Sequence, residues 1–206
     1  MARDPLQLSL PTEFTSQRLS CRRYRAGDGA VYHQMLQENW DHLYEFMPQQ
    51  HLAIRSAEDA EVVLGRLASE WESRNLFIFG VWERASGAYV GECYLANPHW
   101  EVPCIEIGYF IVRASTGRSY ATEAAHALLR FAFTELGVER VELQSRADNV
   151  ASQRVAERCG FTLEGRFRRR HCKKSGTLVD VLWYGLLSDE WRAFNNKTQV
   201  DREHRE

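Results

Sequence analysis

The most constraining feature of the sequence is a strand-like run that leads, through a loop of small residues, into a helix-like run. Residues 105–112 alternate as in a β-strand, and residues 113–118 are mostly small. A helical pattern starts from Ser119, with an apolar stripe that runs from Ala121 to Leu136 before Gly137. A strand joined to a helix by so short a loop predicts an α/β fold in which the helix packs on the sheet.

Other strand-like and helix-like runs of ordinary length fill most of the chain. Seven strands are predicted, at 18–24, 77–82, 89–95, 105–112, 141–146, 161–170 and 177–187, with helices after Asp28, after Ser56, after Ser119 and at 150–159. The helix after Ser56 has the clearest signal, because Ser56 and Asp59 have capping-box spacing and apolar residues follow at helical intervals. We expect one domain over residues 12–192 and a polar, frayed tail over residues 193–206.

Composition excludes several classes of protein. Of 206 residues, 44% are apolar and 26% charged, which is typical of a globular domain. The net charge of −2 argues against a nucleic-acid partner. Five scattered cysteines without a Cys-x-x-Cys pair suit free thiols and predict no metal site. No apolar run approaches the ~20 residues that span a bilayer, and the first residues lack the apolar core of a secretory signal, so we expect a cytoplasmic protein.

The loop between the central strand and its helix has the features of an anion site. Such a junction exposes unpaired backbone N–H groups at the positive end of a helix dipole, which suits a pyrophosphate. Gly117 permits the turn, and Arg118 adds positive charge. A glycine between a strand and a helix is also a common turn residue, so the loop alone leaves both interpretations open.

A second stretch, residues 147–165, carries a family pattern. It resembles the Asn-x-x-Ser-x-x-Val…Gly-Phe…Glu-Gly segment of the GNAT superfamily of acyl-CoA-dependent N-acyltransferases, in its RimJ/RimL-type branch, with Asn149, Ser152 and Val155 at the first three positions. Further matches lie in the family's order at Arg18-Leu19, Val90-Gly91, Glu106-Ile107-Gly108-Tyr109, 120–124 and 180–191. The resemblance covers about residues 12–192, and several weak motifs in one order make a strong signal.

The resemblance implies the GNAT fold, a mixed, mostly antiparallel seven-stranded sheet with flanking helices, splayed between strands four and five. The pantetheine arm of acetyl-CoA then pairs with the exposed strand edge, as in strand addition. The implied cofactor contacts are Phe110, Ile111, Val112, Arg113, Gly117, Arg118, Ser119, Tyr120, Ala121, Asn149 and Ser152. The loop departs from the family's usual Gln/Arg-x-x-Gly-x-Gly/Ala, because Ala114 and Ser119 occupy the first and last positions, with Arg113 beside the first.

Three side chains are candidates for catalysis of amine attack on a thioester. The resemblance makes Glu106 the first candidate for the base, through a water, although a structural carboxylate fits equally well. Ser152 is the candidate donor to the departing thiolate, because Val155 stands where many relatives have a tyrosine; the alternatives are a helix cap and a simple contact with the cofactor. His171 is a second candidate base, or else an exposed histidine in a basic segment. Cys159 and Cys172 both fit buried structural thiols better than nucleophiles.

The acceptor side is predicted from aromatic residues and from charge. Trp40, Tyr44, Phe46, Met47 and Trp100 lie in regions that border the acceptor cleft in this family, although core packing explains most aromatic clusters. Residues 166–174 are the densest basic run, and strand alternation places Arg166, Arg168 and Arg170 on one face. This run is either a solvated strand and turn or a surface that attracts an acidic protein surface, a phosphate-bearing substrate or the phosphates of CoA.

The expected function is transfer of an acetyl group from acetyl-CoA to a primary amine, within a ternary complex, by a monomer or homodimer. The acceptor is either a protein N-terminus or a small amine, and another donor such as succinyl-CoA is an alternative. The rival from another class is a noncatalytic protein that keeps the fold and recognises acyl-CoA or an acidic partner. Release of free CoA thiol in the presence of amines distinguishes the two.

Overall fold

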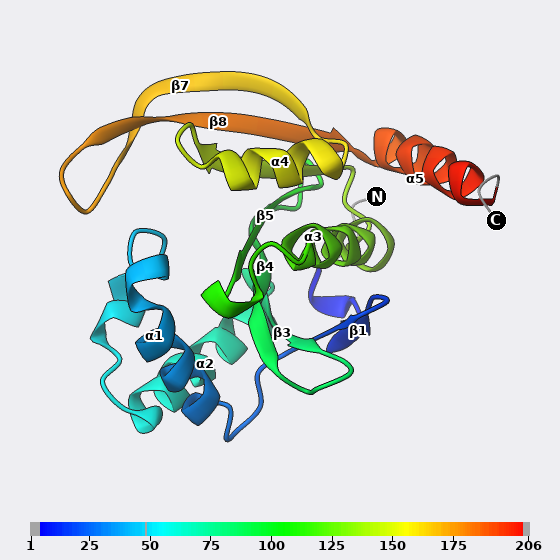
Figure 1. Cartoon of the computed structure of the whole chain (residues 1–206). Coiled ribbons are helices and arrows are strands. Elements are labelled where there is room, and N and C mark those ends of the chain that lie inside the picture. Colours follow the sequence, from blue (N-terminus) through cyan, green and yellow to red (C-terminus); the bar gives the residue numbers. More distant parts are fainter. Residues whose placement is uncertain (1–4, 48, 204–206) are drawn as a thin grey trace.

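One eight-stranded sheet forms the centre of the protein (Figure 1), whose computed structural model describes residues 5–47 and 49–203. Its strands are β1 (Glu13–Thr15), β2 (Leu19–Arg22), β3 (Leu76–Glu83), β4 (Tyr89–His99), β5 (Cys104–Ile111), β6 (Arg140–Arg146), β7 (Thr162–Cys172) and β8 (Leu178–Leu187), in the spatial order β1-β2-β3-β4-β5-β6-β8-β7. Only β5 and β6 pair in parallel. The predicted mixed, mostly antiparallel sheet is confirmed, with one strand more than expected: β1 has three residues and is too short to produce a periodic signal.

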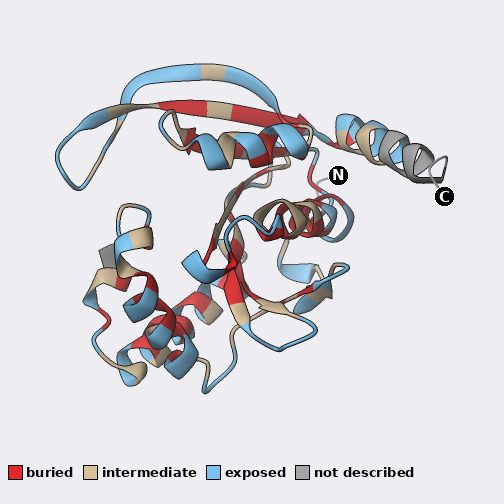
Figure 2. Ribbon diagram, in the orientation of Figure 1, coloured by how far each residue is buried: buried red, intermediate tan, exposed pale blue. Residues whose placement is uncertain are grey.

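Helices cover both faces of this sheet. They are α1 (Gly29–Leu43), α2 (Ala57–Glu72), α3 (Tyr120–Phe131), α4 (Val150–Arg158) and α5 (Ser188–Glu203), with 3-10 turns at Pro5–Gln7, Gln49–Ala53 and Arg113–Ser115 and a π-helical turn at Ala132–Leu136. Helix α3 packs on β4 and β5 on one face, and α1 and α2 pack together on the other. Buried residues gather along the middle strands and the facing sides of the helices, whereas β7 is exposed (Figure 2).

Local signals set the limits of the best-predicted helices. The Ser56 side chain accepts a hydrogen bond from the Asp59 N–H and caps α2, as its spacing predicted. Beyond α3, the chain leaves the π-helical turn at Gly137, whose φ of 68° suits glycine. Helix α5 continues through Glu203 and so extends into residues 193–206, which the sequence set apart as a polar tail.

The sheet opens between β5 and β6, the fourth and fifth of the seven predicted strands. Their parallel pairing includes Cys104 with Arg140, Ile105 with Val141 and Glu106 with Glu142, and it goes no further. Beyond Glu106, β5 remains paired with β4 as far as Ile111, but its other edge has no partner strand. The predicted splay is therefore present, and it begins at Glu106.

The hairpin of β7 and β8 corrects one prediction. Phe167 pairs with Val181 and His171 with Val179, so four steps along β7 match only two along β8. The extra residues form a bulge in which Arg169 has a φ of 51°. The expected alternation of Arg166, Arg168 and Arg170 on one face is wrong, because a bulge of this kind breaks the period of two.

The described residues contain neither a membrane-spanning helix nor a cluster of metal-binding side chains. Within residues 5–47 and 49–203, no helix combines the length and apolar character needed to cross a membrane. The same part of the chain holds no group of three or more His, Cys, Asp or Glu side chains placed to bind a metal ion.

Candidate active site

Glu106 stands where the sheet opens. It is the last residue of β5 that pairs with β6, and its carboxylate Oε2 accepts hydrogen bonds from the Asn97 and Gln144 side-chain amides, each at 3.0 Å. These donors come from the two strands that flank β5, so three adjacent strands fix one carboxylate. Sequence reasoning missed Asn97 and Gln144, because their role depends on strand register.

The surroundings of Glu106 favour a base. Burial raises the pKa of this carboxyl above its usual 4.5, Glu142 adds to the increase, and the amide donors oppose it. A carboxylate with a raised pKa accepts a proton more readily near neutral pH. The site therefore combines a fixed position with increased basicity.

The predicted phosphate loop follows β5 directly. After the turn Arg113–Ser115, Gly117 adopts a φ of 77° and Ser119 a φ of 62°, and α3 begins at Tyr120. Ser119 occupies the N-cap position, but its side chain makes no capping hydrogen bond. The first N–H groups of a helix have no intrahelical acceptor, and those of α3 also lack a cap from Ser119. Residues 116–119 beside them are exposed, as an anion site requires.

Several contacts anchor this loop to the rest of the protein. Arg18 donates to the Arg118 carbonyl oxygen at 3.1 Å and forms an ion pair with Glu123 at 2.6 Å. Glu83 accepts a hydrogen bond from the Tyr120 hydroxyl and lies 3.6 Å from the Arg118 guanidinium. Arg118 is thus partly neutralised by Glu83, whereas the side chain of Arg113 is exposed.

The free edge of β5 offers backbone groups to a ligand. The Val112 N–H donates to the Val90 carbonyl oxygen at 3.0 Å. Because residues of an antiparallel ladder alternate in direction, Phe110 also directs its backbone groups toward β4, and Tyr109 and Ile111 direct theirs toward the opening. Among the predicted main-chain contacts, Ile111 is therefore the residue best placed to pair with a pantetheine arm.

Helix α4 starts beside the same opening. Its N-cap is Asn149, whose side chain accepts the Ser152 N–H at 3.1 Å. The Ser152 hydroxyl is thus released from capping and lies 3.3 Å from the hydroxyl of Tyr109 on β5. Burial raises the pKa of Tyr109, which keeps this phenol protonated. The sequence placed Tyr109 on a strand face but did not suggest this contact with Ser152.

The third predicted catalytic residue lies on a different strand. His171 is half-buried at the edge of the bulge in β7, opposite Val179. The contacts that hold Glu106 come from β4 and β6 and do not involve His171. Its role stays a prediction.

Three of the predicted acceptor residues gather at the end of α1. The rings of Trp40 and Tyr44 lie 5.3 Å apart, and the Arg146 guanidinium lies 4.6 Å from the centre of the Phe46 ring. Lys174, at the tip of the β7–β8 hairpin, donates to the Tyr44 carbonyl oxygen and lies 4.0 Å from the Tyr44 ring. The hairpin and α1, far apart in sequence, thus meet beside the opening (Figure 1).

Trp100 and Met47, which were also predicted to border the acceptor cleft, lie elsewhere in the structure. Trp100 packs against the core that includes Phe77, at 6.5 Å between ring centres, on the face covered by α3. The structure does not bring it to Tyr44 and Phe46. Met47 is buried in the core under α1 and α2.

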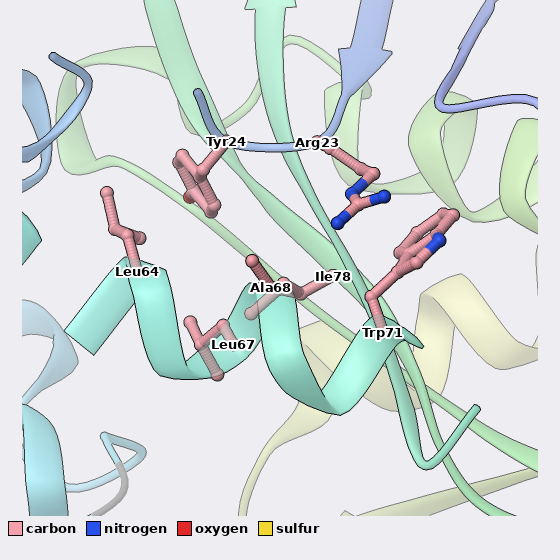
Figure 3. Close-up of a pocket in the computed structure, with 7 residues that line it drawn as sticks. All are labelled: Arg23, Tyr24, Leu64, Leu67, Ala68, Trp71 and Ile78. Atoms are coloured by element: carbon pink, nitrogen blue, oxygen red, sulfur yellow. The ribbon is translucent and has the colours of Figure 1, made fainter. Parts of the chain in front are cut away.

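A small pocket lies away from these groups. It is formed by α2, by the segment after β2 and by β3, and is lined by Arg23, Tyr24, Leu64, Leu67, Ala68, Trp71 and Ile78 (Figure 3). Arg23 stacks 4.6 Å from the Trp71 ring. None of the predicted site residues contributes to it.

A covalent route would use the thiol of Cys159 or Cys172. The predicted burial of Cys172 is wrong, because this residue lies on the exposed strand β7. Cys159 is buried, and burial raises its pKa to about 12. Only the thiolate is a good nucleophile, and little of it forms at neutral pH.

A sheet that opens beside a fixed glutamate, next to a helix start with unpaired N–H groups, is the arrangement expected of the GNAT class. Residues 18–162 match the acetyltransferase (GNAT) domain family, and the chain belongs to this family. The resemblance stated from the sequence is confirmed.

Individual relatives agree with this assignment. The chain is 37% identical over 88 residues to "Putative ribosomal N-acetyltransferase YdaF" of Bacillus subtilis (strain 168), a match that covers 43% of this chain and about half (48%) of that relative. The solved structure of RimL, a ribosomal L7/L12 alpha-N-protein acetyltransferase in complex with coenzyme A, aligns with a TM-score of 0.76 at 20% identity over 86% of this chain and 97% of that one. Mycobacterium smegmatis RimJ in complex with CoA-disulfide aligns with a TM-score of 0.75 at 23% identity, over 84% and 83%. These structures share the fold of this chain.

Proposed function

We propose that this protein transfers an acetyl group from acetyl-CoA to a primary amine, with a protein N-terminus as the preferred acceptor. The observation that carries the proposal is the fixed carboxylate of Glu106 at the point where β5 and β6 separate. An α-amine suits this site, because its pKa of about 7.7–8.0 requires less help from a base than that of a lysine at about 10.4. The names of RimL and of the Bacillus subtilis relative, both ribosomal acetyltransferases, support a protein acceptor.

The proposed mechanism assigns each step to a named group. The pyrophosphate of acetyl-CoA binds the exposed N–H groups at the start of α3, and the pantetheine arm pairs with the edge at Ile111. Glu106 removes a proton from the amine through a water, and the amine attacks the thioester carbonyl. A backbone N–H of the open edge stabilises the oxyanion. As the C–S bond breaks, Ser152 donates a proton to the departing thiolate, which leaves as CoA, and Ser152 recovers a proton from the nitrogen that has attacked, so that the neutral amide is formed.

The test measures CoA thiol released from acetyl-CoA with a panel of acceptors. We expect release with peptides that have free N-termini and much less with the same peptides after N-terminal blocking. Succinyl-CoA in parallel identifies the preferred donor. Native mass spectrometry of the freshly purified protein reveals any retained acyl-CoA. Binding of acetyl-CoA without release for any amine would contradict the enzyme and favour the noncatalytic alternative.

Gly117→Val should weaken acetyl-CoA binding at least about tenfold, because a β-branched residue at a φ of 77° costs on the order of 1–2 kcal/mol and displaces the loop. Isothermal titration calorimetry measures the effect. Gly137→Val is the matched control, since Gly137 has a φ of 68° and similarly open surroundings but lies at the far end of α3. Equal affinity in a folded Gly117→Val protein would place the pyrophosphate elsewhere.

Arg168→Ala/Arg170→Ala should raise the Michaelis constant for an acidic acceptor peptide and leave that for acetyl-CoA unchanged. Both arginines are exposed on the β7 bulge, whereas Arg166 already pairs with Asp180 at 2.7 Å. Attraction between opposite charges falls with added salt, so the difference should shrink at about 0.5 M salt. The double variant Arg66→Ala/Arg192→Ala, which removes two other exposed arginines, controls for the change in net charge. Unchanged constants would favour the solvated-strand interpretation.

A further inference from the structure

Two side chains of α1 hold the backbone at the end of β5. The Asn39 side-chain oxygen accepts the Arg113 N–H at 2.7 Å, and the His42 Nε2 lies 3.2 Å from the Ile111 carbonyl oxygen. Asn39 and His42 are three positions apart and therefore lie on one side of the helix. They contact the chain on either side of Val112, where the strand ends and the phosphate loop begins.

The chemistry of each contact is determined by its partner. A carbonyl oxygen can only accept, so the His42 Nε2 carries the proton and donates it to Ile111. Asn39 is 6% exposed, and its amide is satisfied at both ends, since its nitrogen donates to the Met35 carbonyl oxygen at 3.0 Å. A buried amide with both partners in place has one orientation, and it holds the Arg113 backbone in one position.

The Ile111 carbonyl is held by α1 and also lies on the free edge of β5. By the alternation of the ladder it points toward the opening, where β6 no longer supplies a donor. A carbonyl oxygen has two lone pairs, so the bond from His42 leaves one for a ligand amide. The peptide of Ile111 is thereby oriented before a ligand arrives, which reduces the entropy lost on binding.

We infer that His42 and Asn39 are positioning residues for the acyl-CoA site. They fix the Ile111 carbonyl and the Arg113 N–H, so that the pantetheine edge and the entrance of the phosphate loop keep one geometry. Trp40 lies between Asn39 and His42 in α1, and its ring contacts that of Tyr44, which ends this helix and contacts Lys174. Helix α1 therefore links the donor edge to the acceptor side. This inference rests on the proposed function.

The experiment compares His42→Leu with His42→Gln. Leucine fills similar space without a donor, whereas glutamine supplies an N–H of similar reach. We expect His42→Leu to raise both the dissociation constant and the Michaelis constant for acetyl-CoA by about three- to tenfold, the effect of one hydrogen bond, with kcat changed by less than about twofold. His42→Gln should restore both constants to within about twofold of the wild type.

Matched controls separate positioning from a loss of structure. His33→Leu changes another half-buried histidine of α1. Asn39→Leu removes the hydrogen bond to the Arg113 N–H. Melting temperatures report whether each variant folds. We expect His33→Leu to leave the affinity for acetyl-CoA unchanged and a folded Asn39→Leu to weaken it. Equal or tighter acetyl-CoA binding by a folded His42→Leu, or failure of glutamine to restore binding, would overturn the inference. Wild-type protein that does not bind acetyl-CoA would instead overturn the proposed function.

Discussion

Glu106→Gln should lower turnover by about 100-fold or more near neutral pH, the lower range for loss of a general base. Glutamine keeps the size of the side chain, and its oxygen can still accept from Asn97 and Gln144. The substitution therefore removes basicity with little change in shape. Steady-state rates with saturating acetyl-CoA and a peptide acceptor measure the effect.

The dependence of this loss on pH tests the assignment. In the wild type, the rate should rise with pH as Glu106 loses its proton, at a pKa that burial raises above 4.5. Above about pH 8 a larger fraction of the α-amine is already neutral, so the variant should recover toward the wild type. An undiminished rate for Glu106→Gln at all pH values would exclude it as the base, and His171→Ala would then show whether His171 has that role. Ser152→Ala should lower the rate at every pH.

Glu92→Gln should stabilise the protein strongly at alkaline pH and little at acidic pH. Glu92 is 4% exposed, lies opposite Phe110 on the sheet face under α1 and α2, and accepts a hydrogen bond from the Tyr24 hydroxyl at 2.7 Å. Burial raises its pKa from 4.5 to about 8. The folded protein then keeps a proton that the unfolded chain has lost between these pH values.

The sign of the pH effect follows from proton binding. Because the folded state binds more protons than the unfolded state between pH 4.5 and about 8, stability falls as pH rises through this interval. A pKa raised by this amount lowers the free energy of unfolding by at most about 5 kcal/mol above about pH 8, and Glu92→Gln removes this destabilisation. Urea unfolding at about pH 5 and about pH 8.5 measures the free energy of unfolding of both proteins. Exposed Glu101→Gln is the control, and an equal effect of Glu92→Gln at both pH values would contradict the prediction.

Local signals predicted most of the fold. The capping box at Ser56, the helical stripe up to Gly137 and the strand pattern of residues 105–112 depend on neighbours in sequence, and each corresponds to an element of the structure. The bulge in β7 and the short β1 were missed, because pairing with β8 and β2 defines them. The residues of β1 and of the β7 bulge form no sequence pattern from which this pairing could be predicted.

The sequence by itself determined the family, the order of the elements and the positions of Glu106, Gly117 and Ser152, since these follow from residue types at fixed spacings along the chain. Only the tertiary structure decided which groups surround them. The donors to Glu106 come from β4 and β6, the Ser152 hydroxyl meets Tyr109, and α1 holds the end of β5 through His42. The physical reason is that a hydrogen bond depends on distances of about 3 Å and on direction, which residues far apart in sequence acquire only when the sheet and helices pack.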